Sequence, residues 1–230
     1  MDPADTLDAE MVAYYAARAP EYDEWYLRSD RYVHTEADDA AWKADLDAAA
    51  RWLEDVPMNG EIVELAAGTG WWSPHLARKG DLTLCDISPE MIELARSRLQ
   101  SLGLAAKFEV RDNWAEPGRQ GDGLFAGFWL SHVSRERLPD FLALVNRWLK
   151  PGGVFAFMDS RRDPASGAID HRPPSDDVQQ RRLNDGRTFQ VRKAYYSPVE
   201  LEAALAQVGF GDARVATSQR FFLLGQARRP

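Results

Sequence analysis

The residues best suited to chemistry lie between Glu61 and Gly70, in the segment EIVELAAGTG. An apolar run typical of a buried strand ends there in a turn with two glycines, Gly68 and Gly70, which let the backbone approach a ligand closely. Glu64 precedes the turn, and its carboxylate can accept hydrogen bonds from an ammonium group. The combination favours a ligand that resembles a nucleoside but is positively charged, although a glycine turn alone is also compatible with a plain strand-to-helix corner.

A dinucleotide is a poorer match to the same turn. The dinucleotide fingerprint G-x-G-x-x-G needs a third glycine, where the helix packs closely on the strand, and a pyrophosphate at the helix N-terminus. Counted from Ala66, the third position is Trp71, and counted from Gly68 it is Ser73. Glu64 would also lie close to the phosphates. The turn therefore does not indicate a dinucleotide.

An acidic residue follows the next predicted strand, DLTLCDI at 81–87. Asp86 lies 20 residues after Ala66, where an acidic side chain accepts hydrogen bonds from ribose hydroxyls. Asp86 could instead cap the next helix, but Ser88 and Pro89 are already the residue types expected at its N-cap and first position. This leaves Asp86 free for a ribose.

A third predicted strand, Lys107–Val110, precedes Asp112, Asn113 and Trp114. A carboxylate and an aromatic face at this place could bracket an adenine ring. The alternative is that Asp112 is a loop residue and Trp114 a core residue.

Together these segments resemble a known family. ELAAGTG, CDISPEM, FEVRDNW, DGLFAGFWLSHV and LKPGGVFAFMDS are similar, in this order, to the motifs of class I S-adenosylmethionine-dependent methyltransferases, from about Tyr14 to Gly225. The resemblance implies S-adenosylmethionine as cofactor and S-adenosylhomocysteine as product. Glu64, Gly68 and Gly70 would hold the methionine part, Asp86 the ribose and Asp112 the adenine amino group; the other implied contacts are Tyr14, Tyr22, Ala66, Ile87, Met91, Asn113, Trp114 and Phe128. In one departure, Ala66 replaces the first family glycine.

The order of elements predicts an α/β fold with a doubly wound, Rossmann-like sheet whose ligand lies beyond the carboxyl ends of the strands. We expect further strands at 124–129, 154–158, 213–217 and 221–225, a hairpin within 181–195, and helices at 38–53, 71–78, about 135–149 (capped by Ser134) and 197–209. The sheet is expected to have seven mostly parallel strands, and the resemblance implies that the last is antiparallel. One domain is predicted, with a helical lid at 1–57, a cofactor-binding core at 58–159, an insertion with the hairpin at 160–196 and closing elements at 197–230.

The N-terminal lid concentrates aromatic residues, six of them Tyr or Trp between Tyr14 and Tyr32. Aromatic faces and tyrosine oxygens accommodate a sulfonium cation well. Some of these rings must simply pack into the core. The segment YYAARAPEYDEWY resembles the N-terminal part of small-molecule methyltransferases, which makes Tyr14 and Tyr22 the candidates for contact with the cofactor.

Methyl transfer from a sulfonium needs mainly alignment, with a general base only where the acceptor must lose a proton. His132 follows the fourth predicted strand, where an acceptor would lie, and an imidazole is suited to removing a proton near neutral pH. A structural role for His132 at the helix start is equally compatible with the pattern. Asp159, at the end of the fifth strand, could also orient an acceptor.

The composition and charge of the chain limit the kinds of molecule that it is expected to bind. The formal net charge is −8, and no basic stripe surrounds the predicted site, so a nucleic-acid substrate is not expected. A basic cluster at 161–193 could meet an acidic substrate or form a solvated hairpin face, which the sequence favours. No apolar run reaches the ~20 residues of a membrane span, and the acidic first residues predict a cytoplasmic protein. The single cysteine, Cys85, cannot form an intrachain disulfide, and the four histidines show no metal-ligand spacing.

We therefore expect an S-adenosylmethionine-dependent methyltransferase that acts on an oxygen, nitrogen or carbon atom of a small molecule. The alternative is a non-methylating protein of the same fold that binds the cofactor, as a partner subunit or as an enzyme such as a cyclase. The acceptor and the oligomeric state are not encoded in any pattern recognised in the sequence.

Overall fold

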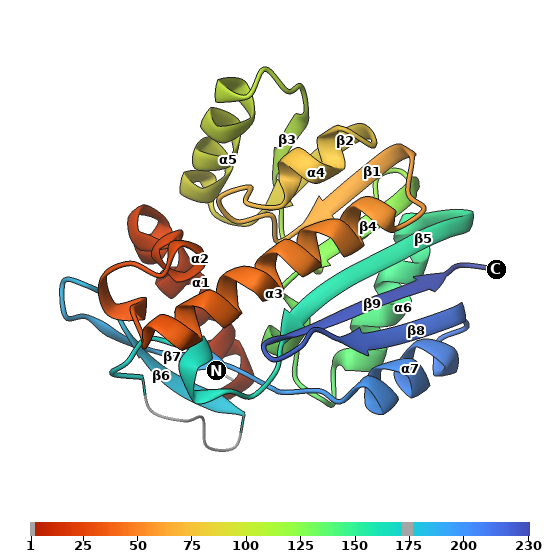
Figure 1. The fold of residues 1–230 in the computed structure, drawn as a ribbon. Helices are drawn as coiled ribbons and strands as arrows, with labels where there is room; N and C mark the ends of the chain where they lie inside the picture. The colour runs from red at the N-terminus through yellow and green to blue at the C-terminus, as the bar shows by residue number, and fades with distance from the viewer. Residues whose placement is uncertain (1–2, 172–176) are drawn as a thin grey trace.

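The computed structural model describes residues 3–171 and 177–230, and of residues 3–5 it describes the backbone alone. Its centre is a seven-stranded sheet in the order β3-β2-β1-β4-β5-β9-β8 (Figure 1). All neighbouring strands are parallel except the pairs formed by β9, which is antiparallel to both β5 and β8. The fold prediction is thereby confirmed. The strands are β1 Gly60–Leu65, β2 Gly80–Asp86, β3 Lys107–Val110, β4 Gly121–Gly127, β5 Leu149–Ser160, β8 Gly211–Thr217 and β9 Phe222–Arg228.

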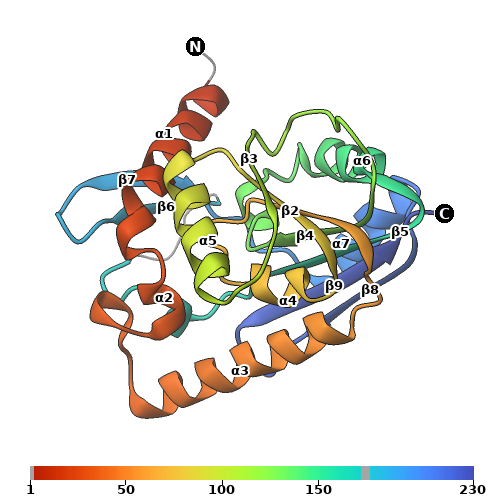
Figure 2. The ribbon, with the colours of Figure 1, turned by 90° about the horizontal axis from the view of Figure 1, so that it is seen from above.

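Helices cover both faces of the sheet (Figure 2). Alternation along β5 explains the two layers, because Phe155 and Phe157 belong to one buried cluster while Val154, Ala156 and Met158 belong to the other. The first cluster includes residues of α6 and α7, and the second includes residues of α3, α4 and α5. These helices are α3 Glu36–Asp55, α4 Ser73–Ala77, α5 Pro89–Ser101, α6 Leu138–Trp148 and α7 Pro198–Gln207.

A cap lies beyond the carboxyl ends of the parallel strands (Figure 1). It combines the N-terminal helices α1 (Pro3–Arg18) and α2 (Glu24–Leu27) with a hairpin of β6 (Val178–Arg182) and β7 (Thr188–Arg192). Met11 and Tyr14 of α1 pack with Leu183 and Val191 of the hairpin in a small separate core. The predicted lid and the predicted insertion therefore meet, although the domain boundaries themselves stay a prediction.

Several element ends differ from their predicted positions. The helix predicted at 135–149 begins at Leu138, because residues 134–137 form a turn in which the Arg137 amide donates to the Ser134 carbonyl (3.0 Å). The fourth strand stops at Gly127, since Phe128 turns the chain with φ 57. The cap at Ser88 is confirmed, as its hydroxyl accepts from the Met91 amide (3.2 Å). Among the described residues, no helix has the length and apolarity needed to cross a membrane.

Candidate active site

Side chains from neighbouring strands hold the turn that follows β1. The Ala66 amide donates to Asn113 Oδ1 (2.9 Å), and the Gly68 amide donates to Asp86 Oδ2 (2.8 Å). Ala66 has φ 52, a left-handed conformation that favours glycine, and Phe128 after β4 has φ 57. Two of the six described non-glycine residues with a positive φ thus lie where β1 and β4 end, at the switch point of the sheet.

A cleft of about 300 Å³ opens at these strand ends. It brings together the predicted base, His132, and most of the predicted cofactor contacts. Those that line it are Tyr22, Ala66, Gly68, Asp86, Ile87, Met91, Asp112, Asn113, Trp114 and Phe128. Their contact with a cofactor stays a prediction, but the structure gathers them in one place.

The remaining predicted contacts do not line the cleft. Glu64 is only 2% exposed and its Oε2 accepts from Ser73 Oγ (2.5 Å), while burial raises the pKa of its carboxyl to about 8. Gly70 makes room for α5, since a Cβ there would lie 2.9 Å from the Cβ of Ala95. Tyr14 is fully buried against the hairpin. Glu64 and Gly70 shape the turn from behind, and a direct contact of any of the three with a cofactor stays a prediction.

Asp86 lines the cleft, but its carboxylate is not free of local hydrogen bonds, whereas the sequence predicted that it would be. Its contact with a ribose stays a prediction. Besides the Gly68 amide, its carboxylate accepts from the Ser88 amide (2.9 Å). Burial raises the pKa of Asp86, and these amides oppose the change. Elsewhere in the cleft, the Arg137 guanidinium lies 3.9 Å from the ring centroid of Trp114 and so covers one face of the indole.

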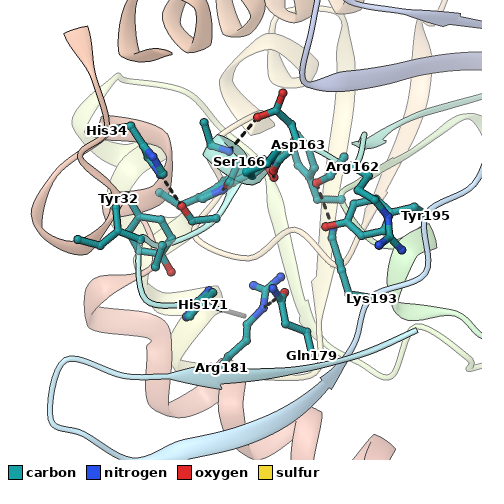
Figure 3. Close-up of a pocket in the computed structure, with 18 of the residues that line it drawn as sticks. Tyr32, His34, Arg162, Asp163, Ser166, His171, Gln179, Arg181, Lys193 and Tyr195 are labelled. Carbon is teal, nitrogen blue, oxygen red and sulfur yellow. Dashed lines mark hydrogen bonds between the residues drawn. The ribbon is translucent and has the colours of Figure 1, made fainter. Parts of the chain in front are cut away.

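A second cavity, which we call the chamber, lies between the cap and the ends of β4 and β5 and has a volume of about 640 Å³ (Figure 3). Its walls come from the N-terminal lid, from the segment after β5 and from the hairpin. Tyr15, Tyr22, Phe128 and His132 line both the chamber and the cleft. The two cavities therefore share one boundary, and His132 belongs to it.

Hydrogen bonds define the state of His132. Nδ1 lies 2.7 Å from the Arg192 carbonyl oxygen, which can only accept, so Nδ1 carries the proton. Nε2 is then the acceptor for the Tyr15 hydroxyl at 2.7 Å. Burial, with the positive charges of Lys193 and Arg181, lowers the pKa of His132 well below its usual range. The imidazole is neutral at physiological pH, as a proton acceptor must be.

Asp159 does not line the chamber, and its predicted part in orienting an acceptor stays a prediction. It is 2% exposed and accepts from the amides of Ser131 and Ser160, each at 2.7 Å. Lys193 Nζ lies 3.5 Å from Asp159 Oδ1 and donates to the hydroxyls of Ser131 (2.9 Å) and Ser160 (3.0 Å). Burial lowers the pKa of Lys193 to about 8. Asp159 thus lies behind Lys193, which does reach the chamber.

Comparisons with known proteins decide the family. A family profile described as a methyltransferase domain matches residues 62–153. The chain is also 31% identical to DhpI over 97% of both chains, with a TM-score of 0.75, in a structure described as the DhpI-SAH complex. A second DhpI structure, described as its complex with SAM and HEP, matches equally well. The chain belongs to the class I S-adenosylmethionine-dependent methyltransferases.

Curated relatives of this methyltransferase match over a shorter stretch. Demethylmenaquinone methyltransferase of Tropheryma whipplei is 33% identical over 128 residues, which cover 54% of this chain and 51% of that protein. The biotin biosynthesis bifunctional protein BioCD of Bordetella avium is 32% identical over 141 residues, or 56% of this chain and 27% of that protein. The chain spans about half the length of these relatives, or less, and the acceptors that their names imply belong to those proteins.

The cofactor of this methyltransferase is S-adenosylmethionine, and the residues of the cleft suit it. A Cβ added to Gly68 would lie 3.6 Å from the Tyr22 ring, so the glycine keeps the space between turn and lid open. Trp129 Nε1 is buried at the cleft without a hydrogen-bond partner among the described residues, which leaves a donor for a ligand atom. The acidic side chains Asp86 and Asp112 supply acceptors for hydroxyl and amino groups.

Some site residues were missed from the sequence, above all Tyr15, Arg18, Arg181 and Lys193. The alternation of side chains along a strand could have indicated Arg181, because residues two apart point to the same face. Gln179 and Arg181 are two apart, and both line the chamber. The preferred interpretation of the basic cluster as a solvated face is wrong for Arg181 and Lys193. It holds for Arg187, which is exposed and pairs with Asp185 (2.7 Å).

Proposed function

We propose that this methyltransferase transfers the methyl group to an oxygen, nitrogen or carbon atom of a small molecule bound in the chamber. One observation carries the proposal: the cleft and the chamber share Tyr15, Tyr22, Phe128 and His132 as a common boundary. A molecule in each cavity would meet there and nowhere else along the two linings. Such positioning is the main contribution that a protein makes to an in-line displacement.

The residues of the cleft are assigned to the cofactor. Asp86 and Ile87 would hold the ribose, Asp112, Asn113 and Trp114 the adenine, and Gly68 with the turn the methionine part. S-adenosylmethionine supplies an electrophilic methyl group and leaves as the neutral thioether S-adenosylhomocysteine. Tyr22 and Phe128 exclude water from the boundary, because both side chains face the two cavities.

His132 is assigned as the general base for an acceptor that carries a proton. The Arg192 carbonyl fixes Nδ1–H, so the lone pair of Nε2 points towards Tyr15 at the boundary. The acceptor donates its proton to the Tyr15 oxygen while the Tyr15 hydroxyl proton passes to Nε2, in one concerted transfer. Tyr15 then stays a neutral phenol throughout, consistent with the upward shift of its pKa by burial.

Two measurements test this function. Titration calorimetry with S-adenosylhomocysteine should show saturable binding, and a cleft variant, Asp86→Asn, should weaken it. Incubation with methyl-labelled S-adenosylmethionine and a panel of phenols, amines, carboxylates and indoles should then label at least one acceptor. Tight cofactor binding with no labelled acceptor in any class would instead favour the non-methylating alternative, against which the family membership counts.

A further inference from the structure

The chamber is lined by more cationic than anionic side chains. Five lysine or arginine side chains reach it, against two aspartates, Asp38 and Asp163. The basic residues are Arg18, Arg162, Arg181, Lys193 and Arg220. Buried charges are costly unless they are paired, so the ion pairs of these five side chains decide how much positive charge the chamber keeps.

Two of the basic residues have carboxylate partners. Arg220 lies 2.7 Å from Asp38 and 2.8 Å from Asp163, which uses both aspartates of the lining. Lys193 lies 3.5 Å from Asp159 beneath the chamber. Arg162 is exposed to solvent, which screens its charge. No ion pair with the described residues neutralises Arg18 or Arg181, so their positive charges remain uncompensated there.

Arg18 is the more deeply buried of these two arginines. It is 4% exposed, and its Nε has no hydrogen-bond partner among the described residues. Its guanidinium carbon lies 4.7 Å from the ring centroid of Tyr22 and 5.5 Å from that of Tyr32. Burial raises the pKa of both phenols, which therefore stay neutral and offer π faces but no counterion. A buried guanidinium without a counterion is costly, and a bound anion would remove that cost.

Arg181 extends from the hairpin into the middle of the chamber, with Gln179 beside it and His171 opposite (Figure 3). Its Nε donates to Gln179 Oε1 (3.2 Å), which fixes the plane of the guanidinium. Burial lowers the pKa of His171 to about 3, so this imidazole is neutral and does not repel Arg181. The planar fork of an arginine held in this way matches the oxygens of a carboxylate or phosphoryl group.

We infer that the acceptor of this methyltransferase carries an oxyanion, a carboxylate, phosphate, phosphonate or sulfonate, which Arg181 and Arg18 bind in the chamber. This rests on the proposed assignment of the chamber to the acceptor. The oxyanion supplies the negative charge that the lining lacks and anchors the acceptor with one end towards Tyr15 and His132. The neutral amide or alcohol analogue of the same molecule leaves both arginines without a partner and binds poorly.

Binding is the decisive test, because it does not depend on methyl transfer. The protein loaded with S-adenosylhomocysteine is titrated with compounds of one aromatic scaffold, carrying a carboxylate, phosphonate, phosphate ester, sulfonate or neutral amide. Fluorescence reports binding through Trp25, which lines the chamber. We expect saturable binding of at least one oxyanion and at least tenfold weaker binding of the amide. Comparison of the carboxylate with the phosphonate, phosphate ester and sulfonate shows whether the site prefers a planar or a tetrahedral oxyanion.

Matched variants assign the effect to the chamber. Arg181→Met should weaken oxyanion binding about 10- to 100-fold, and Arg181→Lys should restore part of it. Arg187→Met removes the same charge from the exposed part of the hairpin and should leave binding unchanged. The cofactor affinity of all three variants should equal that of the wild type, which also shows that they are folded.

The inference is overturned if the amide binds as tightly as the oxyanions, if no oxyanion binds, or if Arg187→Met has the same effect as Arg181→Met. The proposed function fails differently. If oxyanions bind through Arg181 but labelled methyl never reaches any acceptor, the anion site stands and the methyl transfer to a chamber ligand does not. If neutral acceptors are methylated as well as oxyanions, the function stands and the anion site does not.

Discussion

The Tyr15 hydroxyl lies 2.7 Å from Nε2 of His132, and both side chains line the cofactor cleft and the chamber. The pair is held from behind by the Arg192 carbonyl, 2.7 Å from Nδ1 of the imidazole. The lid and the end of β4 thus meet in one hydrogen bond at the place where methyl transfer is proposed. Whether this bond serves catalysis or only packing can be measured.

His132→Ala should lower kcat by about 10²- to 10⁴-fold for an acceptor that loses a proton, because the general base is removed. The affinity for S-adenosylhomocysteine should change by less than about threefold, since other side chains are assigned to the cofactor. Tyr15→Phe should lower kcat by about 10- to 100-fold if the hydroxyl relays the proton. Steady-state kinetics and calorimetry measure both quantities. A pH–rate profile that is identical in wild type and His132→Ala would remove His132 from the mechanism.

Lys193→Met should raise the pKa of His132 towards its usual value, because the positive charge of Lys193 disfavours a second positive charge on the imidazole. Burial remains the larger cause, so the pKa should stay below 6.5. His132 is active when neutral, so the acid limb of the rate profile should move to higher pH in the variant. Titration of the imidazole resonances by NMR checks the shift without an acceptor. An unchanged or lower pKa would contradict the prediction.

Lys193→Met should also alter the alkaline limb of the pH–rate profile. The Lys193 ammonium has a pKa near 8, so its positive charge is present below that pH and is lost above it. If this charge assists binding or turnover, wild-type activity should decline as the pH rises through about 8. Lys193→Met carries no such charge, and its alkaline limb should disappear. An alkaline limb of the same midpoint in both proteins would assign it to another group.

Much of the core could be predicted because its signals are local. The strand at 107–110 was placed without error, and the Ser88 cap follows from residue type and from Pro89 beside it. The cleft followed as well, because parallel strands present their carboxyl ends at one edge of the sheet, which brings Gly68, Asp86 and Asp112 together.

The errors have tertiary causes. The helix predicted to start at Trp71 begins at Ser73, since the Trp71 ring stacks on Tyr26 of the lid with centroids 4.3 Å apart. The chamber could not be predicted, because it depends on the hairpin folding back over α1, which places Arg181 6.0 Å from the Tyr14 ring centroid. Neither contact has a signal in local composition or periodicity.

Glu64→Gln should change how stability depends on pH. The carboxyl has a pKa of about 8 in the folded protein, against 4.5 for an ordinary glutamate. Its contribution to stability is therefore fully present below pH 4.5 and is lost as the pH rises through about 8. The loss has an upper limit of roughly 1.4 kcal/mol per pH unit for a single group.

The glutamine cannot ionise, so the variant should gain stability relative to the wild type between pH 5 and about 8, with little difference near pH 4.5. Urea unfolding of the cofactor-free proteins at several pH values measures this difference. Parallel pH dependences would mean that Glu64 is not buried as a neutral acid. The same variant tests the predicted role of Glu64 towards the cofactor ammonium, for which S-adenosylhomocysteine should bind about tenfold more weakly.

The lid is fastened to the cofactor turn through Asp23. Its Oδ1 accepts from Thr69 Oγ1 (2.6 Å), and its Oδ2 pairs with Arg98, whose Nε also donates to the Thr69 carbonyl (3.0 Å). The Asp23 and Arg98 side chains are 30% and 27% exposed, so solvent screens the pair only in part. Loosening this contact should free the lid residue Tyr22 from the cleft.

Asp23→Asn removes the ion pair but can keep the Thr69 hydrogen bond, whereas Asp23→Ala removes both. We expect the affinity for S-adenosylhomocysteine to fall in that order, by about threefold and about tenfold, mainly through faster dissociation. Asp30→Asn makes the same charge change at an exposed position of the same lid and should have no effect. Stopped-flow dissociation rates measure the series. If Asp23→Ala leaves the dissociation rate of the cofactor at the wild-type value, the lid does not depend on this contact to retain the cofactor.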